Sequence, residues 1–310
     1  MNSTANHTYK DDDCYPDDIL PKHFFIVLQL LIMLIGIPAN IFSLFVSCHH
    51  IKQKNELGIY LLNLALSDIC FIASLPIWII YTIKGSWIHT STMCTVCVFL
   101  LFTNFYTSAW LLSCIAVDRY LGVVYPLRFT FFRKPSSALV VSAAAWLLVI
   151  IMNSFIISPK SIYDEDAMVC LDVYPLRKRN INVARFVLGF FLPAVVVVFC
   201  YWRICKEVQS NKATSCLERK RLFRLLGSVL LSLTLCFGPL HVALLLRAVL
   251  EDCKPPTWLF LLIQIGKALS KLNCLADPFL YCFITRTGRS SIIQAIMMLK
   301  RKEEGATMTQ

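Results

Sequence analysis

Residues 24–48 read FFIVLQLLIMLIGIPANIFSLFVSC, a continuous apolar run that contains no Asp, Glu, Lys or Arg. About 20 helical residues cross the roughly 30 Å hydrocarbon core of a bilayer, so Phe24–Cys48 is long enough to be a transmembrane helix. Six more stretches have the same apolar character: Leu57–Ile83, Ser91–Val117, Ser136–Pro159, Phe186–Trp202, Leu225–Leu246 and Thr257–Ile284. The sequence therefore predicts an all-α membrane protein with a seven-helix transmembrane bundle over residues 23–284.

The composition of the whole chain supports this fold class. Of its 310 residues, 57% are hydrophobic and 16% are charged, and the mean hydropathy is +0.64. Soluble domains are usually about 45–50% apolar and about 25% charged. The formal net charge of +11 comes from lysines and arginines between the apolar runs, so it does not indicate a nucleic-acid partner.

Lysine and arginine are concentrated on one side of the predicted bundle. They lie in three connections and in the tail: residues 49–56, 118–135, 203–224 and 285–310. The other side is acidic, apart from Arg177–Arg179. By the positive-inside rule, residues 1–22 form an extracellular tail and residues 285–310 face the cytoplasm. Ser290–Leu299 has the apolar periodicity of a short amphipathic eighth helix that lies on the lipid of the inner leaflet.

The side predicted to be extracellular carries two kinds of covalent signal. Asn2 and Asn6 each begin a glycosylation sequon, and both lie in the N-terminal tail. Four cysteines also fall on this side: Cys14, Cys94, Cys170 and Cys253. An even number of cysteines in an oxidising compartment predicts two disulfides, and three pairings are open. These features predict a multi-pass protein of the plasma membrane.

Ionisable residues inside the predicted spans are costly in lipid and are therefore candidates for function. Asp68 lies in the middle of the second span, and the seventh contains Lys267, Lys271 and Asp277. Helical spacing places Asn273 and Asp277 on one face and the two lysines on another. The lysines therefore do not simply neutralise Asp277 within their own helix.

The motifs of the seven runs resemble those of rhodopsin-like (class A) G-protein-coupled receptors along essentially the whole chain. In order they are Asn40, Leu64–Asp68, Trp87, Cys94, Asp118-Arg119-Tyr120, Trp146, Pro193, Tyr201, Cys236–Pro239 and Asp277–Tyr281. The resemblance implies a Cys94–Cys170 disulfide, which leaves Cys14 and Cys253 for a second one. It also implies a heterotrimeric G protein as partner, with arrestin as a further one.

A narrower resemblance points to the proton-sensing and psychosine-receptor subgroup. It is carried by Asn55–Leu61, Leu75–Trp78, Trp87–His89 and Leu272–Pro278. In that subgroup acidification outside the cell is thought to protonate outer histidines and buried carboxylates. Here His89 and His241 are the candidate sensors, but Val149 and Gln264 replace a Glu and a His of the subgroup.

The resemblance assigns an activation switch to residues at the cytoplasmic half of the bundle. They are Asp118, Arg119, Tyr120, Tyr201, Phe237, Pro239, Asp277, Pro278 and Tyr281. Pro239 removes a helix hydrogen bond and predicts a kink about which the sixth span swings. Many relatives place an acid on the sixth span to hold the equivalent of Arg119, but this chain has Arg219 there. We therefore expect a weak resting contact and measurable basal activity.

A second set of polar residues matches the positions that surround a sodium ion in the family. The set is Asp68, Ser108, Asn273 and Asp277. Oxygen ligands suit a hard cation such as sodium. The alternative is that the two carboxylates share a proton without any ion. No other cofactor is expected.

Lys267 and Lys271 are the least ordinary residues of the seventh span. Lys271 lies one helical turn deeper than Lys267, and the family arrangement places His241 toward the same pocket and Arg247 nearer its outer mouth. Two cations on one face indicate an anionic ligand, such as a lysophospholipid headgroup. The alternatives are neutralisation by Asp68 or Asp277, or an uncharged Lys271.

Together these patterns predict a receptor that responds to extracellular protons, to an anionic lysolipid, or to both, and that activates a heterotrimeric G protein. One alternative is a retinal-binding opsin that uses Lys271, although the third span offers no intramembrane acid as counter-ion. Another is a receptor for a different small anion, such as a nucleotide or a fatty acid. The sequence contains no nucleophile–base constellation typical of an enzyme and no internal repeat typical of a transporter.

Overall fold

The computed structural model describes residues 20–157, 162–170, 179–210, 216–250 and 256–284. Within this part, seven helical spans are long and apolar enough to cross a membrane. The first four are α1 (Lys22–Lys52), α2 (Leu57–Ile72) with α3 (Leu75–Lys84), α4 (Ser91–Val124) and α5 (Pro135–Ile156). The fifth is α7 (Arg179–Phe186), η3 (Val187–Phe191) and α8 (Leu192–Ser210). The sixth is α9 (Cys216–Ser232), η4 (Leu233–Phe237) and α10 (Gly238–Leu250), and the seventh is α11 (Thr257–Lys271) and α12 (Asn273–Ile284).

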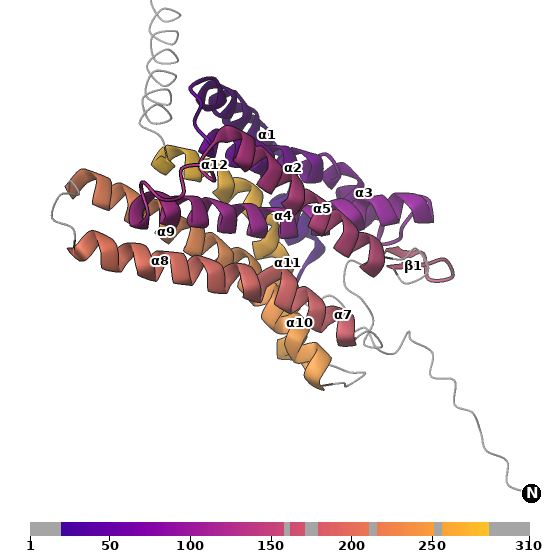
Figure 1. Cartoon of the computed structure of the whole chain (residues 1–310). Coiled ribbons are helices and arrows are strands. Elements are labelled where there is room, and N and C mark those ends of the chain that lie inside the picture. Colours follow the sequence, from indigo (N-terminus) through magenta and orange to yellow (C-terminus); the bar gives the residue numbers. More distant parts are fainter. Residues whose placement is uncertain (1–19, 158–161, 171–178, 211–215, 251–255, 285–310) are drawn as a thin grey trace, which may run out of the picture.

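These spans lie side by side as one helical bundle, which confirms the predicted fold (Figure 1). The third span forms its centre, because α4 packs against α2, α5 and α8. In the most apolar stretch of α4, 78% of the residues are buried, compared with 22% in α1 and 28% in α5. The outer helices therefore present most of their apolar side chains to lipid, which replaces a soluble protein's polar surface.

Three spans are interrupted just before a proline. Pro76, Pro193 and Pro239 are each the second residue of a helical segment, in α3, α8 and α10. The π-helical turns η3 and η4 directly precede the last two of these segments. Proline lacks an N–H donor, so the preceding turn loses a hydrogen bond and the helix deforms there. The kink predicted at Pro239 is thus a widened turn next to Phe237.

The fifth span is longer than the sequence predicts. The expected run was Phe186–Trp202, but the membrane-spanning helix extends over Asn180–Ser210. The helix continues past the polar side chains at both ends because its backbone hydrogen bonds continue. Hydropathy marks only where the apolar run ends and not where the helix ends. The correction matters because it brings Arg185 inside the bundle.

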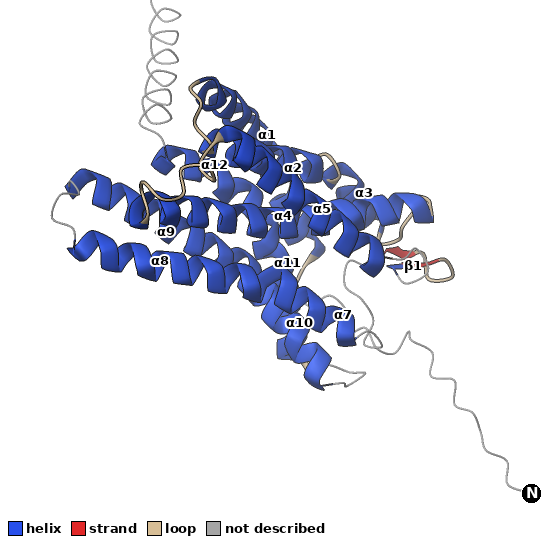
Figure 2. Ribbon diagram, in the orientation of Figure 1, coloured by secondary structure: helices blue, strands red, loops and turns tan. Residues whose placement is uncertain are grey.

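One end of the bundle is closed by a short hairpin of β1 (Tyr163–Asp164) and β2 (Val169–Cys170), drawn in red in Figure 2. Cys170 is joined to Cys94 at the start of α4 by a disulfide, so the implied pairing is present. The backbone N–H of Trp87 donates to the carbonyl oxygen of Met168 at 2.6 Å. The hairpin is therefore tied to both α4 and the loop that precedes it.

Several expectations lie outside the described residues. They are the glycosylation sites Asn2 and Asn6, the cysteines Cys14 and Cys253, and the eighth helix within residues 285–310. The side chain of Tyr281 also lies outside the description.

Candidate functional site

A cavity lies between the third, sixth and seventh spans. Its lining residues are Leu101, Phe102, Phe105, Leu240, Leu244, Lys267 and Lys271. The cavity is small, about 10 Å³, which is room for roughly one water molecule, so it has to widen to admit a ligand headgroup. Five of the lining residues are apolar, and Lys267 and Lys271 contribute the hydrocarbon stems of their side chains to the lining.

The two lysines of α11 share this cavity, as their helical spacing predicts. Lys271 is only 6% exposed, and its Nζ lies 5.8 Å from the ring centroid of Trp78 in α3. Lys267 is half-buried. Arg247 is buried on α10, outside the set of described residues that line the cavity. The aromatic face of Trp78 stabilises the deeper ammonium group by a cation–π contact.

Arg185 is a further buried cation that the sequence analysis misses. It lies in α7, its side chain is fully buried, and its guanidinium carbon is 3.9 Å from the ring centroid of Phe102. Phe102 also lines the cavity, so Arg185 contacts one of the lining residues. The apolar run began at Phe186, one residue too late. The sequence did offer one signal. Arg185 immediately precedes the apolar run, and a helix that begins earlier than the run places this charge inside the bundle.

His241 is buried inside the bundle and is 2% exposed. Its Nδ1 donates to the carbonyl oxygen of Phe237 at 2.8 Å. Its ring lies 5.7 Å from Phe190 in a stacked arrangement and 5.9 Å from Tyr106. His241 is outside the set of described residues that line the cavity. This geometry is that of a core histidine and not of one that meets extracellular water.

His89 is placed differently, in the loop between α3 and α4. Its ring meets the ring of Trp87 edge-on at 5.5 Å, and Trp87 in turn lies 5.9 Å from Trp78. The Nε2 atom of His89 is buried and has no hydrogen-bond partner among the described residues. A chain of aromatic contacts therefore connects His89 to the ring beside Lys271.

The buried polar centre of the bundle contains the set predicted to hold sodium. Asn104 donates to Asp68 Oδ1 at 2.8 Å, and Asn273 donates to Asp277 Oδ2 at 2.9 Å. Ser232 of α9 donates to Asn273 Oδ1 at 3.0 Å. Asn104 and Ser232 were not predicted, because neutral polar residues inside an apolar run carry no distinct signal. The structure thus pairs Asn273 with Asp277 and gives Asp68 a different partner.

The oxygens left over in this centre fit a small hard cation. Asp68 Oδ2 and Asp277 Oδ1 are both buried and have no hydrogen-bond partner within the described ranges. The fully buried Ser108 lies beside Asp277. Two carboxylate oxygens and a hydroxyl are the donors that sodium takes, and they equally suit one shared proton.

Phe237 joins the cavity to the sixth span. It is fully buried in η4, and its ring lies 6.0 Å from that of the cavity residue Phe105. A change at the cavity wall can therefore reach the widened turn η4 through the contact between these two rings. A separate ring contact joins α8 to α9: Tyr201 lies 6.4 Å from Phe223, measured between ring centroids.

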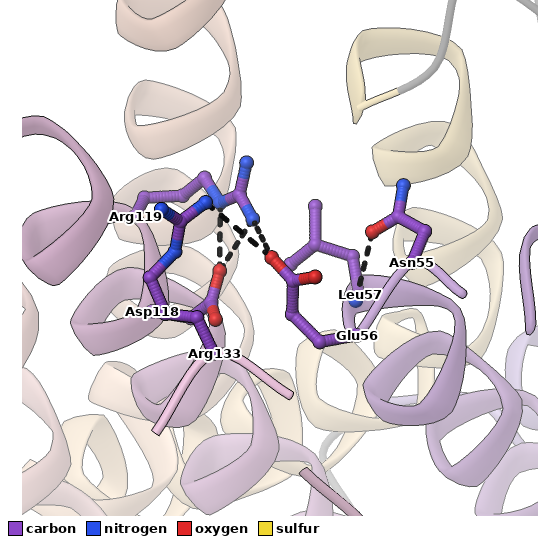
Figure 3. A network of polar contacts seen from close by, with 6 residues as sticks. All are labelled: Asn55, Glu56, Leu57, Asp118, Arg119 and Arg133. Carbon is purple, nitrogen blue, oxygen red and sulfur yellow. Dashed lines mark hydrogen bonds and ion pairs between the residues drawn. The ribbon is translucent and has the colours of Figure 1, made fainter. Parts of the chain in front are cut away.

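Asp118 and Arg119 belong to an ion-pair network near the C-terminal end of α4 (Figure 3). Arg119 Nε donates to Asp118 Oδ2 at 3.0 Å, and Arg119 Nη2 donates to Glu56 Oε1 at 2.9 Å. Arg133, from the connection between α4 and α5, reaches the same Glu56 oxygen at 3.6 Å. Glu56 immediately precedes α2 and was not predicted, because 63 residues separate it from Arg119.

Arg119 has a second acidic partner that the sequence analysis does not foresee. Arg219 of the sixth span lies over the ring of Phe223 at 5.6 Å, and Glu56 supplies the second carboxylate from the turn before α2. The measurable basal activity expected from the sequence stays a prediction.

The profile of a known family covers most of this seven-helix chain. Residues 39–281 match the family described as 7 transmembrane receptor (rhodopsin family). The chain belongs to this rhodopsin family. The family consists of receptors and not enzymes, and the seven spans make this rhodopsin-family receptor a multi-pass protein of the plasma membrane.

Relatives of this rhodopsin-family receptor align over nearly its whole length. G-protein coupled receptor 65 of Homo sapiens is 40% identical and covers 93% of this chain and 88% of its own. G-protein coupled receptor 68 of Bos taurus is 36% identical, with coverages of 92% and 80%. Lysophosphatidic acid receptor 4 of Homo sapiens is 27% identical, with coverages of 94% and 80%. These relatives confirm the family resemblance that the motifs indicate.

Proposed function

We propose that this receptor, with its N-terminus outside the cell, binds the anionic headgroup of a lysolipid in the cavity between α4, α10 and α11. Headgroup binding then activates a heterotrimeric G protein through the rearrangement of the sixth span. The observation that carries the proposal is the pair Lys267 and Lys271, which lines an otherwise apolar cavity. A lysolipid has the matching chemistry, with one charged end and one acyl chain.

Two further features support an anionic ligand. The buried guanidinium of Arg185 behind Phe102 adds positive potential to the cavity wall, and a buried charge acts with little screening by solvent. One relative is named as a receptor for lysophosphatidic acid, an anionic lysolipid. G-protein activation agrees with the names of two other relatives.

The test compares ligands that differ in headgroup charge alone. Transfected cells held at pH 7.8 receive lysophosphatidic acid, a neutral monoacylglycerol with the same acyl chain, the free fatty acid, or a nucleotide, with cAMP, calcium and Rho readouts. We expect a response to lysophosphatidic acid and none to the monoacylglycerol. Equal responses to both would overturn the proposal. A response to fatty acid or nucleotide alone assigns another anion, and a visible absorption band after addition of retinal to the purified receptor assigns an opsin.

Proton sensing is a second candidate function, and the position of His89 favours it. Histidine is the side chain whose charge changes between pH 5 and 8, and a positive ring beside the indole of Trp87 is stabilised by its π-electrons. Protonation as the pH falls therefore favours a tighter His89–Trp87 contact, and the aromatic chain carries this to Trp78 beside Lys271.

His89→Gln tests this candidate in cells titrated from pH 8 to pH 6 without added lipid. The unchanged receptor is expected to raise its second-messenger signal as the pH falls, and the variant to respond with a smaller amplitude. The control is His23→Gln, since His23 is exposed on α1. A flat signal from the unchanged receptor removes proton sensing, and equal curves for both variants and the unchanged receptor remove the role of His89.

The buried carboxylates Asp68 and Asp277 complete the proposal as the site of a sodium ion that stabilises the resting state. Their unpaired oxygens and the Ser108 hydroxyl would hold the ion. A cation between α2, α4 and α12 opposes any movement that separates these helices. Agonist affinity that is equal in sodium chloride and in choline chloride would favour a shared proton instead.

A further inference from the structure

Glu56 occupies an unusual place for an acid at the cytoplasmic end of a bundle. Its side chain is 12% exposed, and a single oxygen, Oε1, faces two guanidinium groups. Arg119 is at hydrogen-bond distance, 2.9 Å, whereas Arg133 stands off at 3.6 Å. Arg119 already pairs with Asp118 beside it, so its contact with Glu56 is additional to that pair.

The position of Glu56 is fixed by the first two spans and not by α4. Lys54 adopts a left-handed backbone conformation with φ 59°, and the side chain of Asn55 accepts the backbone N–H of Leu57 at 3.1 Å. Gly58 lets α2 begin directly against α1, because a Cβ there would lie 2.9 Å from His50 Cβ. Glu56 is therefore a rigid point against which Arg119 is held.

Arg133 approaches Glu56 across the surface of α4. A Cβ atom on Gly122 would lie 2.8 Å from Arg133 Cζ, so the absence of a side chain at Gly122 makes room for this guanidinium. The side chain of Arg133 is 28% exposed, and its Nη2 is 3.6 Å from Glu56 Oε1, so a small shift brings it to hydrogen-bond distance. The geometry thus places a second cation beside the carboxylate that Arg119 occupies.

We propose that Glu56 holds Arg119 in the resting receptor, and that Arg133 replaces Arg119 on Glu56 when Arg119 turns toward the G protein. The proposal rests on the G-protein coupling proposed above. Removing one partner of a buried ion pair leaves an uncompensated charge, which is strongly unfavourable. Arg133 avoids this outcome because it takes over the carboxylate. The exchange also moves the connection between α4 and α5 at the moment when Arg119 is released.

The proposed replacement of Arg119 by Arg133 predicts opposite effects for substitutions of Glu56 and of Arg133. In Glu56→Gln, Arg119 loses one of its two acids and no buried carboxylate is left behind on release, so the active state becomes easier to reach. In Arg133→Gln, release of Arg119 leaves Glu56 uncompensated, so the active state becomes harder to reach. In the double variant no charge is left behind, and Arg133 is no longer needed.

The experiment measures basal nucleotide exchange on a purified heterotrimeric G protein with the receptor in lipid nanodiscs. We expect Glu56→Gln to raise the basal rate about five-fold, Arg133→Gln to leave it at or below the rate of the unchanged receptor, and the double variant to match Glu56→Gln. The control is Glu207→Gln in α8, which makes the same charge change without an ion pair in the described residues. An unchanged rate in Glu56→Gln, or a rise in both single variants, would overturn the proposal.

Hydrogen–deuterium exchange, measured on the receptor alone, distinguishes two possible failures. Either Glu56 does not hold Arg119, or the receptor does not couple to the G protein. Glu56→Gln is expected to speed amide exchange in residues 119–134 relative to Glu207→Gln, whether or not a G protein is present. If no variant exceeds empty nanodiscs in nucleotide exchange but this difference appears, the proposed coupling is wrong and the Glu56–Arg119 contact stands. If the difference is absent, the contact does not hold Arg119.

Discussion

Gly266→Ala is expected to lower the thermal denaturation midpoint of this receptor by roughly 5 °C or more. A Cβ atom at Gly266 of α11 would lie 2.7 Å from both the backbone N and the Cα of Leu240 in α10. Neither atom belongs to a flexible side chain, so the two helices themselves must move apart. Small residues are what allow helix backbones to approach closely in membranes.

The matched control is Gly227→Ala in α9. A Cβ at Gly227 meets nothing within 4 Å in the described part of the chain. Alanine favours a helix over glycine by about 1 kcal/mol, so this variant is expected to keep or slightly raise the midpoint. A thermal-shift measurement on both purified variants in the same detergent decides the matter. Equal midpoints for the two variants would contradict the close packing of α10 on α11.

The seven spans could be predicted from the sequence because lipid imposes one simple requirement. A segment that crosses the bilayer must satisfy its backbone hydrogen bonds internally and must be apolar, and both demands are local. Phe24–Cys48 meets them without reference to any other residue. The end of a span is harder to predict, because a polar residue such as Arg185 ends the apolar run but not the helix.

The polar contacts between spans could be predicted only in part. The pairing of Asn273 with Asp277 follows from helical spacing within one span. The contact of Asp68 with Asn104 crosses from α2 to α4, and a neutral amide in an apolar run gives no warning of it. Glu56 was overlooked for a related reason: a charge in a cytoplasmic turn is ordinary in sequence, and only the packing of α2 against α4 brings it to Arg119.

Among the aromatic and basic residues around the cavity, too, positions within one regular helix could be predicted and contacts between spans could not. The spacing of Lys267 and Lys271 correctly predicts that they share one face. His241 follows the widened turn η4, and its ring contacts Phe190 and Tyr106. A π-helical turn changes the angular position of every later residue in its span, and an ideal helix drawn from the sequence does not include that change.

The double variant Lys267→Met/Lys271→Met is expected to abolish the response to lysophosphatidic acid, or to raise its half-maximal concentration about 100-fold or more. Hydrogen bonds to charged groups contribute about 1.5–3 kcal/mol each, and two of them together account for a change of this size. Methionine keeps an unbranched side chain of similar length, so the apolar walls formed by Leu240 and Leu244 remain filled.

The measurement is a concentration–response curve at pH 7.8, with surface expression determined on the same cells. Lys84→Met is the control for a Lys→Met change away from the cavity, since Lys84 is exposed at the C-terminal end of α3. Lys271→Arg separates charge from position: it keeps the cation beside Trp78, so its curve is expected to lie between those of the unchanged receptor and the double variant. If the double variant responds like Lys84→Met, the headgroup binds elsewhere. Such a result would mean that the response does not need the ammonium groups of Lys267 and Lys271.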